Sequence, residues 1–297
     1  MTLPTIAAIE AGGTKFVVSV CKGDQLGGRI TVPTSDPATT LSSVTDAINH
    51  ELSRGTLDAV GIASFGPIDV VVTSTTFGTI GTTPKPGWTG VNLREYFQGA
   101  FNCPVGIESD VNGAALAEAA WEIERPINHL AYVTVGTGIG VGIVHSGAIS
   151  NGTSHPEIGH IRLTRHAEDA AFEGVCPFHS DCLEGLASGP AIFERWQATL
   201  SDLDPHHAAH DIEAFYLGQL AANIALHHRP EVIIFGGGVS QTLGLIPRVR
   251  KECQSALGGY LPDLDTSDAI ASLIQPPRLG TDSGIRGAYM LGKARLN

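Results

Sequence analysis

The sequence predicts an α/β protein with either two lobes or one large domain. Its 297 residues exceed the size at which a single hydrophobic core keeps growing. Short apolar runs of β-forming residues alternate with stretches of helical spacing. Two Gly/Thr turns, each between a pair of such strands, suggest a duplicated phosphate-binding turn.

The composition argues against nucleic-acid and membrane partners. Lys and Arg number 18 against 30 Asp and Glu, which gives a formal net charge of −12. No apolar run approaches the roughly 20 residues of a membrane span, and residues 1–5 lack the regions of a signal peptide. The five cysteines are an odd number, and only Cys176 and Cys182 are close in sequence, so a disulfide framework is not expected. We therefore expect a cytoplasmic protein.

The first glycine turn lies between the predicted strands 6–9 and 16–20. It reads Glu10-Ala-Gly-Gly-Thr-Lys and lacks the Walker A spacing. One interpretation is a plain hairpin turn; the other is that bare backbone N–H groups face a nucleotide phosphate. In the second case Glu10 would hold Mg²⁺ through water. The ATP-binding candidates are then Gly12, Gly13, Thr14 and Lys15.

Two loops follow the helical stretch 39–52. The strand 59–63 runs into Ser64-Phe-Gly-Pro-Ile-Asp, a turn-rich tip at a carboxyl end, where α/β sheets bind ligands. Gly66 in this tip is a candidate substrate-binding residue. The irregular segment 82–88 contains Lys85 and Trp88. We expect it to be a solvated loop.

Polar residues follow the predicted strand 104–108 and precede a helix that starts near residue 113. Ser109, Asp110 and Asn112 are all residue types that cap helices, and capping is one interpretation. The alternative is that Asp110 is a catalytic base, since a carboxylate at the end of a strand can reach a substrate hydroxyl. Asn112 is a further candidate for binding the substrate.

Two more glycine-rich turns follow strands in the second half. The strand 129–135 leads into Gly136-Thr-Gly, and the strand 230–235 leads into Gly236-Gly-Gly. Both are interpreted either as ordinary turns or as sites where a nucleotide approaches bare backbone. The nucleotide interpretation adds six ATP-binding candidates: Gly136, Thr137, Gly138, Gly236, Gly237 and Gly238.

The segment 157–184 carries two thiols and several imidazoles. Cys176-Pro-Phe-His179-Ser-Asp-Cys182 together with His160 supplies the four donors that tetrahedral zinc requires. The alternative is a pair of buried cysteines beside surface histidines. Four protein ligands leave no open coordination position, so the metal would be structural. It would fix a loop that carries Glu157, His160 and Glu184, which suit a polyhydroxylated ligand.

The histidines outside this segment support a weaker hypothesis of a second metal site. His206 and His210 are spaced i, i+4 and form an alternative second metal site, or they simply precede the helical stretch 211–228. His227 and His228 are interpreted as the end of that helix.

These motifs together resemble the ROK family of sugar kinases, within the actin-like ATPase superfamily, over nearly the whole chain. The zinc segment and Thr83-Pro-Lys-Pro-Gly-Trp88 are most similar to the bacterial zinc-containing fructokinases. The resemblance implies a two-lobed actin-like ATPase (ribonuclease H-like) fold with nucleotide and sugar in the interlobe cleft. The small lobe would span 1–113, with the C-terminal helix 280–297 packing back on it. The large lobe would span 114–279 and carry the zinc-binding segment.

The resemblance also implies an activity: ATP- and Mg²⁺-dependent phosphorylation of a hexose, most similar to that of D-fructose to fructose 6-phosphate. Asp110 matches the family's base, and Glu157, His160 and Glu184 match its sugar-binding positions. His160 would then serve both zinc and a sugar hydroxyl through its two ring nitrogens. A homodimer is also expected from the family.

The sequence departs from the family pattern at three positions, and several other functions compete with the fructokinase interpretation. Glu10 replaces the usual Asp, Ser109 stands where many glucokinases have Asn, and His179 replaces a thiol in a shortened zinc knuckle, with His166 as a substitute ligand. The rival substrates are mannose, glucose and an N-acetylated hexosamine. A sugar-responsive repressor and a zinc hydrolase are the rival classes.

Overall fold

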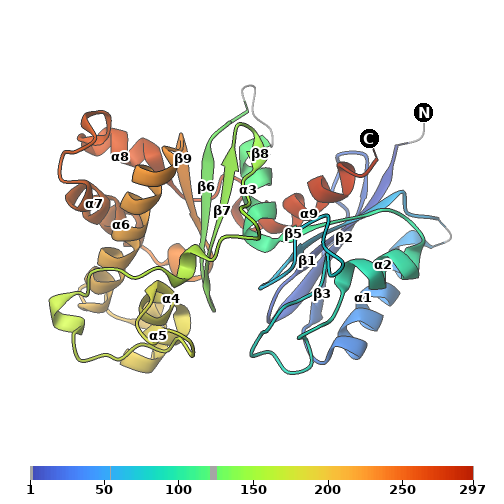
Figure 1. Ribbon diagram of the computed structural model, residues 1–297, viewed down its shortest axis with the longest axis horizontal. Helices are drawn as coiled ribbons and strands as arrows, with labels where there is room; N and C mark the ends of the chain where they lie inside the picture. Colours follow the sequence, from blue (N-terminus) through green and yellow to red (C-terminus); the bar gives the residue numbers. More distant parts are fainter. Residues whose placement is uncertain (1–2, 54, 121–125, 297) are drawn as a thin grey trace. The chain divides into compact units, whose positions relative to one another are not determined.

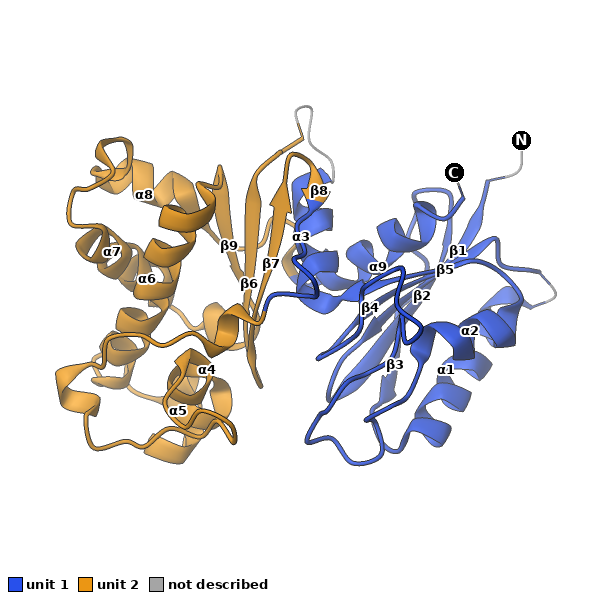
Figure 2. Ribbon diagram, viewed as in Figure 1, with its two compact units in different colours: residues 1–122, 149–156, 281–297 blue, residues 123–148, 157–280 orange. Residues whose placement is uncertain are grey.

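The computed structural model describes residues 3–53, 55–120 and 126–296. The chain divides into two compact units (Figures 1 and 2). Unit 1 comprises residues 1–122, 149–156 and 281–297, and unit 2 comprises residues 123–148 and 157–280. The expected division at 113/114 differs from these units in two ways. The helix that begins at Asp110 stays in unit 1 to its end, and the segment 149–156 returns to unit 1.

Unit 1 is built on a five-stranded sheet with the order β3-β2-β1-β4-β5. β1 and β2 form an antiparallel hairpin, and β4 and β5 add parallel strands beside β1. The strands are β1 (Thr5–Ala11), β2 (Lys15–Lys22), β3 (Ile30–Pro33), β4 (Ala59–Ser64) and β5 (Val105–Ser109). Every residue of β4 and β5 is buried, as expected for strands covered on both faces.

Four helices belong to unit 1: α1 (Pro37–Leu52), α2 (Leu93–Phe101), α3 (Asp110–Ala120) and α9 (Ser283–Lys293). The C-terminal α9 packs on the sheet at glycines. A Cβ atom at Gly61 of β4 would lie 1.8 Å from the carbonyl oxygen of Ala288, and one at Gly287 would lie 2.2 Å from the backbone of Gly113. Only glycine permits these approaches, so they fix α9 against both β4 and α3.

Unit 2 repeats the same plan. Its sheet has the order β10-β9-β6-β7-β8, in which β6 and β7 form an antiparallel hairpin and β9 lies parallel to β6. The strands are β6 (Leu130–Val135), β7 (Ile139–His145), β8 (Ala148–Ile149), β9 (Val232–Gly236) and β10 (Ile274–Gln275). The turns β1–β2 and β6–β7, which carry the two Gly/Thr motifs, therefore occupy equivalent positions in the two sheets.

The helices of unit 2 are α4 (Leu183–Ala187), α5 (Gly189–Trp196), α6 (Ala209–His228), α7 (Leu245–Leu257) and α8 (Ser267–Leu273). The long α6 has almost no exposed face over most of its length, since thirteen of its 20 residues are buried. It forms the centre of a hydrophobic core that also includes β6, β7 and β9.

The interpretation of residues 82–88 as a solvated loop was wrong in one respect. Trp88 is fully buried, with its ring centroid 5.6 Å from that of Phe16 and 5.5 Å from that of Phe65. Its indole N–H donates to the carbonyl of Ser35 at 2.8 Å. A buried aromatic ring with a satisfied N–H holds this loop on the sheet.

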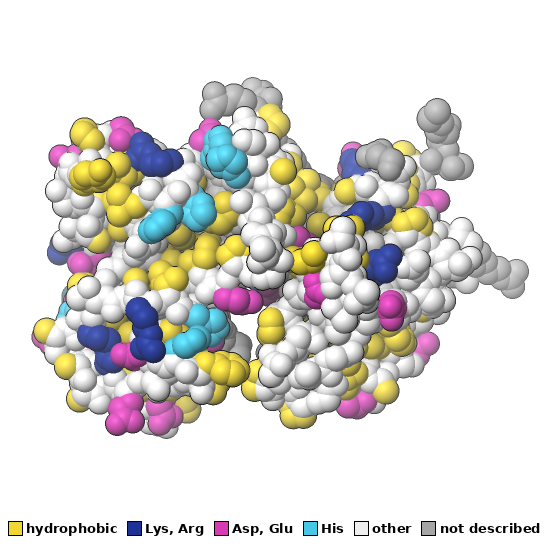
Figure 3. Space-filling view, in the orientation of Figure 1, with side chains coloured by type: hydrophobic (Ala, Val, Ile, Leu, Met, Phe, Trp, Pro, Cys, Tyr) yellow, Lys and Arg dark blue, Asp and Glu magenta, His cyan; other side chains and the backbone are white. Residues whose placement is uncertain are grey.

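On the face shown in Figure 3, acidic and basic side chains are interspersed and the visible histidines gather on unit 2. Among the described residues, no helix combines the length and the apolar character needed to cross a bilayer.

Candidate functional site

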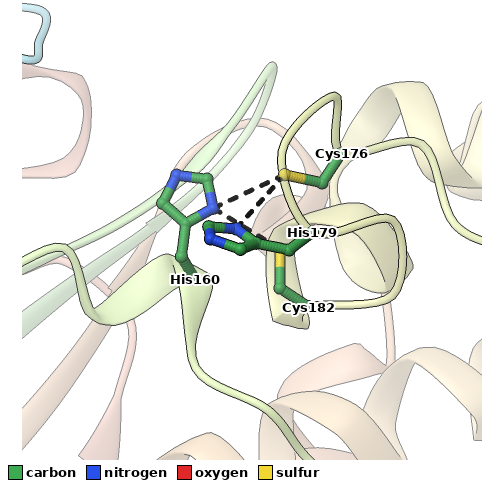
Figure 4. Close-up of side chains that lie close together, drawn as sticks. All are labelled: His160, Cys176, His179 and Cys182. Carbon is green, nitrogen blue, oxygen red and sulfur yellow. Dashed lines mark hydrogen bonds between the residues drawn. The ribbon is translucent and has the colours of Figure 1, made fainter.

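The predicted metal ligands come together in unit 2 (Figure 4). His160 ends a 3-10 turn, Ile158–His160, and the other three lie on the loop that enters α4. Reciprocal backbone hydrogen bonds between Cys176 and Ser180 close that loop, and Ser180 has a left-handed φ of 55°. Gly185 lies against the loop, since a Cβ there would be 1.9 Å from the carbonyl of Ser180.

The ligand atoms of His160, Cys176, His179 and Cys182 all lie within 4.8 Å of one another. Nδ1 of His160 is 3.4 Å from Sγ of Cys182 and 3.7 Å from Sγ of Cys176, and Nδ1 of His179 is 3.6 Å from Sγ of Cys176. A tetrahedral zinc ion with Zn–S of about 2.3 Å and Zn–N of about 2.0 Å separates S and N by about 3.5 Å. The geometry therefore fits zinc.

The electrostatics of the thiols also favour a cation. Burial, with smaller contributions from Cys176 and Glu184, raises the pKa of the Cys182 thiol to about 11. A divalent cation among the four donors would stabilise the thiolate and reverse this shift. Among the described residues, these four form the one group of three or more donors with metal-binding spacing. His166 and His210 lie outside it; His166 instead packs edge-on against Phe215.

The His160 ring of the metal-binding cluster lies next to the Glu184 carboxylate. With Nδ1 of His160 turned toward the sulfurs, its Nε2 lies 3.9 Å from Oε1 of Glu184. Loss of solvent raises the pKa of the Glu157 carboxyl, an effect that His160 opposes and Glu184 reinforces. The three predicted sugar-binding residues are thus neighbours within unit 2, and they offer hydrogen-bonding groups that suit sugar hydroxyls.

Glu184 also contacts the second glycine turn. Its Oε2 accepts a hydrogen bond from the backbone N–H of Ile139 at 2.9 Å, and a Cβ atom at Gly138 would lie 2.6 Å from the same oxygen. A side chain at Gly138 would therefore have to displace the Glu184 carboxylate.

We expect Gly138→Ala to raise the KM for sugar about tenfold, which corresponds to about 1.4 kcal/mol of binding. The reason is that the methyl group displaces Glu184 from its position next to His160. Steady-state kinetics with sugar as the varied substrate measures this. Gly99→Ala, in α2 and outside the candidate site, is the matched control, because a Cβ there meets no atom within 4 Å. An unchanged sugar KM in Gly138→Ala would remove Glu184 from the binding site.

A cavity of about 650 Å³ in unit 2 adjoins the same turn. Of the predicted nucleotide residues, Gly136, Thr137 and Gly238 line it. Gly237 has a φ of 85°, and a Cβ there would lie 2.3 Å from the carbonyl of Val135, so it is needed for the turn itself. Gly236 is held close to the Tyr132 hydroxyl in the same way. Gly138 and Gly236 thus do not line the cavity, but their close contacts shape the segments next to it.

Sequence reasoning missed the opposite wall of this cavity, which α5 and the segment after it supply. Its residues include Pro190, Phe193 and Thr199. The N–H of Gly189 donates to the carbonyl of Gly136 at 2.7 Å, which joins the start of α5 to the glycine turn. Apolar walls with a few polar groups and bare backbone fit a nucleotide. The only available sequence signal was Gly189-Pro190 at a helix start.

The first glycine turn belongs to unit 1. The N–H of Gly12 donates to the carbonyl of Lys15 at 3.0 Å, and the hydroxyl of Thr34 donates to the carbonyl of Gly12 at 2.8 Å. Lys85 donates to the carbonyl of Gly13. Gly13 and Thr14 are exposed, so the backbone of this hairpin faces solvent, as a phosphate-binding turn requires.

Asp110 occupies the first position of α3. Its Oδ1 accepts the N–H of Val111 at 2.8 Å, and the hydroxyl of Ser109 accepts the N–H of Asn112 at 3.3 Å. Ser109 is therefore the residue that caps the helix. The helix begins three residues earlier than predicted because this cap lies at the end of β5.

Glu10 lies near Asp110 and against the first turn of α9. A Cβ atom at Gly284 would be 2.5 Å from its carboxylate. Burial and, to a smaller extent, the charge of Asp110 raise the pKa of Glu10 to about 7, against the opposing charges of Lys15 and Arg29. A bound Mg²⁺ would reverse this shift, since a cation favours the ionised carboxylate.

The raised pKa of Glu10 predicts a pH-dependent stability. The folded pKa of about 7 exceeds the unfolded value of 4.5, so the contribution to stability is fully present below pH 4.5 and is lost as pH rises through 7. In magnesium-free buffer, we expect this group alone to lower the free energy of unfolding by about 3 kcal/mol between pH 4.5 and pH 8. Glu10→Gln should lack this loss in denaturant titrations. Glu51→Gln, on the exposed side of α1, is the control, and a parallel pH dependence of Glu10→Gln and wild type would contradict the assignment.

Asn112 lies in a polar cluster that the sequence did not predict. Its Nδ2 contacts Oε1 of Glu108 at 3.1 Å, Oδ1 of Asn151 at 2.9 Å and Nδ1 of His155 at 3.2 Å. Its own Oδ1 is buried without a protein partner among the described residues. Because a buried polar atom needs a partner, this oxygen is suited to accept a hydrogen bond from a ligand hydroxyl.

Glu108, Asn151 and His155 are therefore candidates that the sequence analysis missed. Burial raises the pKa of Glu108, against hydrogen bonds from the N–H of Ser109 and the amides of Asn112 and Asn151. The segment 149–156 brings the other two to α3, and its polar sequence Asn-Gly-Thr-Ser-His was the only signal. The sequence candidate Gly66 is exposed at the tip after β4.

The comparisons with known proteins agree with this geometry. The ROK family model matches residues 6–295. The chain is 40% identical to a putative fructokinase of Bacillus subtilis over 98% of this chain and 96% of that one. It is 39% identical to a fructokinase of Zymomonas mobilis over 97% of this chain and 96% of that one.

A solved structure, the ROK hexokinase from Thermus thermophilus, has a TM-score of 0.77 and 25% identity to this chain, covering 98% of each. The fold is shared with ROK sugar kinases, which confirms the predicted actin-like ATPase fold class. The chain belongs to the ROK family.

Proposed function

We propose that this protein is an ATP-dependent hexose kinase whose substrate is D-fructose and whose product is fructose 6-phosphate. The observation that carries the choice of sugar is the similarity, at 37–40% identity over most of the chain, to five proteins named as fructokinases or a putative fructokinase. Three structural features support a kinase: two equivalent glycine turns, a carboxylate at the start of a helix, and a group of polar side chains next to the Cys/His cluster.

The residues of unit 2 hold the sugar and the nucleotide in this proposal. Glu157, His160 and Glu184 hydrogen-bond sugar hydroxyls, and the cavity beside Gly136 and Thr137 receives the nucleotide. Because His160 donates Nδ1 to the metal cluster, its Nε2 is fixed for the sugar. Phosphoryl transfer depends mainly on such positioning and on neutralisation of charge.

Unit 1 supplies the base. Asp110 accepts the proton of the attacking primary hydroxyl, while the orphaned Oδ1 of Asn112 accepts a second hydroxyl of the sugar. Mg²⁺, held through water near Glu10, would neutralise charge on the phosphates when bound. The backbone of Gly12–Lys15 faces the phosphates.

The donor set of His160, Cys176, His179 and Cys182 is proposed to hold a structural zinc ion. All four positions of a tetrahedral ion are then occupied by protein, which disfavours the zinc hydrolase. We also propose a homodimer and a cytoplasmic location. The latter is supported by five free, buried cysteines.

An ADP-release assay with fructose, mannose, glucose and N-acetylmannosamine tests the substrate. We expect the highest kcat/KM with fructose, since the most similar relatives are named for that activity. A preference for another hexose would overturn the choice of sugar and retain the kinase. No ATP consumption with any of them would overturn the kinase and favour the repressor.

A further inference from the structure

Unit 1 contains a second cavity, of about 530 Å³, none of whose lining residues belongs to the candidate site. One wall comes from α2, where Arg94 and Gln98 are four residues apart, and from Asn102, which caps the C-terminal end of that helix. Residues at that spacing lie on one side of a helix. The loop containing Phe77 forms a second wall, and Arg295, just after α9, forms a third.

The cavity is positively charged in a protein of net charge −12. Two guanidinium groups line it, and no Asp or Glu does. Within the described part of the chain, neither Arg94 nor Arg295 forms an ion pair with a carboxylate; Arg94 lies over the ring of Phe77 at 5.3 Å. The nearby Asp58, which together with burial raises the pKa of the Cys103 thiol, accepts the N–H of Thr5 at 2.7 Å.

Each arginine lies against another segment of unit 1. The guanidinium carbon of Arg94 is 5.3 Å from the centroid of the Phe77 ring, and Cγ of Arg295 would lie 3.3 Å from a Cβ atom at Gly106 of the edge strand β5. Two like charges that share a cavity without a counter-charge repel each other, so a bound anion would stabilise the arrangement.

The side chains that line the cavity favour phosphate as the bound anion. Guanidinium groups match the oxygens of phosphate in a bidentate geometry, and the amides of Gln98 and Asn102 add neutral donors. The apolar faces of Val72 and Phe77 leave room for a carbon skeleton, and the volume lies in the usual range of small-molecule sites, roughly 300–1,000 Å³. We propose that this cavity binds the phosphate group of a small phosphorylated molecule, separately from the kinase site.

Calorimetric titration of the full-length protein tests the proposal. The probes are fructose 6-phosphate and inorganic phosphate, with fructose and a non-hydrolysable ATP analogue present at saturation so that the kinase site is filled. The variants are the double substitution Arg94→Gln with Arg295→Gln, and the control Arg229→Gln, which removes one exposed charge paired with Asp263 in unit 2. Thermal unfolding of each variant confirms that it is folded.

We expect at least one probe to bind wild type and Arg229→Gln equally, and to bind the double variant at least tenfold more weakly. Tighter binding of fructose 6-phosphate identifies a phosphate ester as the ligand, whereas equal binding of both probes identifies phosphate alone. Identical titrations of the double variant and wild type with both probes would overturn the proposal. Because the readout is binding and not turnover, that failure is distinct from a failure of the proposed kinase activity.

Discussion

Replacing Asp110 with Asn is expected to lower kcat for the hexose by roughly 10²- to 10⁴-fold, the range that general base catalysis contributes. The amide keeps the size of the side chain and an oxygen that can still accept the N–H of Val111, so α3 should form normally. It cannot take the proton of the attacking hydroxyl. The KM for sugar should change much less than kcat, because the other hydroxyl contacts remain.

The measurement is steady-state kinetics alongside thermal unfolding, with Asp46→Asn on the exposed side of α1 as the control. A second readout is independent of turnover. Asp110 raises the pKa of Glu10, so Asp110→Asn should shift the pH dependence of stability assigned to Glu10 toward lower pH. A kcat close to that of wild type would refute Asp110 as the base.

His179→Ala is expected to remove zinc and to lower the melting temperature by about 5–6 °C, which corresponds to about 3–4 kcal/mol at this chain size. Loss of one of four ligands leaves the two thiols of Cys176 and Cys182 close together without a cation. The KM for sugar should rise as well, because His160 and Glu184 depend on the same loop.

Metal content by mass spectrometry, with the melting temperature and sugar KM, tests this prediction. His166→Ala is a matched control: the same substitution in the same segment, at a histidine outside the cluster. It should keep one zinc per chain. Stoichiometric zinc in His179→Ala would exclude His179 from the ligand set, and its loss in His166→Ala would make His166 the fourth ligand.

Much of the fold was predictable because its signals are local. Alternating strands and glycine turns indicated the α/β class, and β4 (Ala59–Ser64) and β6 (Leu130–Val135) agree within one residue with the predicted strands 59–63 and 129–135. Four metal donors could be selected because three of them lie within seven residues, which forces them to be near one another.

The residues around the site were harder to predict from the sequence. The loop at 82–88 contains two prolines and a glycine and looked solvated, yet Trp88 is fully buried in contact with Phe16 and Phe65 from other segments. Local composition does not show which distant rings will surround a side chain. Asn151 and His155 were missed for the same reason, since their partners Glu108 and Asn112 lie about 40 residues away.

The sequence by itself therefore determined the chemical groups: the candidate base Asp110, the thiols and imidazoles, and the glycine turns, whose chemical properties follow from their residue types. Only the tertiary structure decided which of those groups lie close to one another and which have no partner. It placed Glu184 in the space left by Gly138, left the Oδ1 of Asn112 buried without a partner among the described residues, and brought Arg94 and Arg295 to one cavity. Such relations depend on distances between segments far apart along the chain, and chain folding sets those distances through the packing of the whole core.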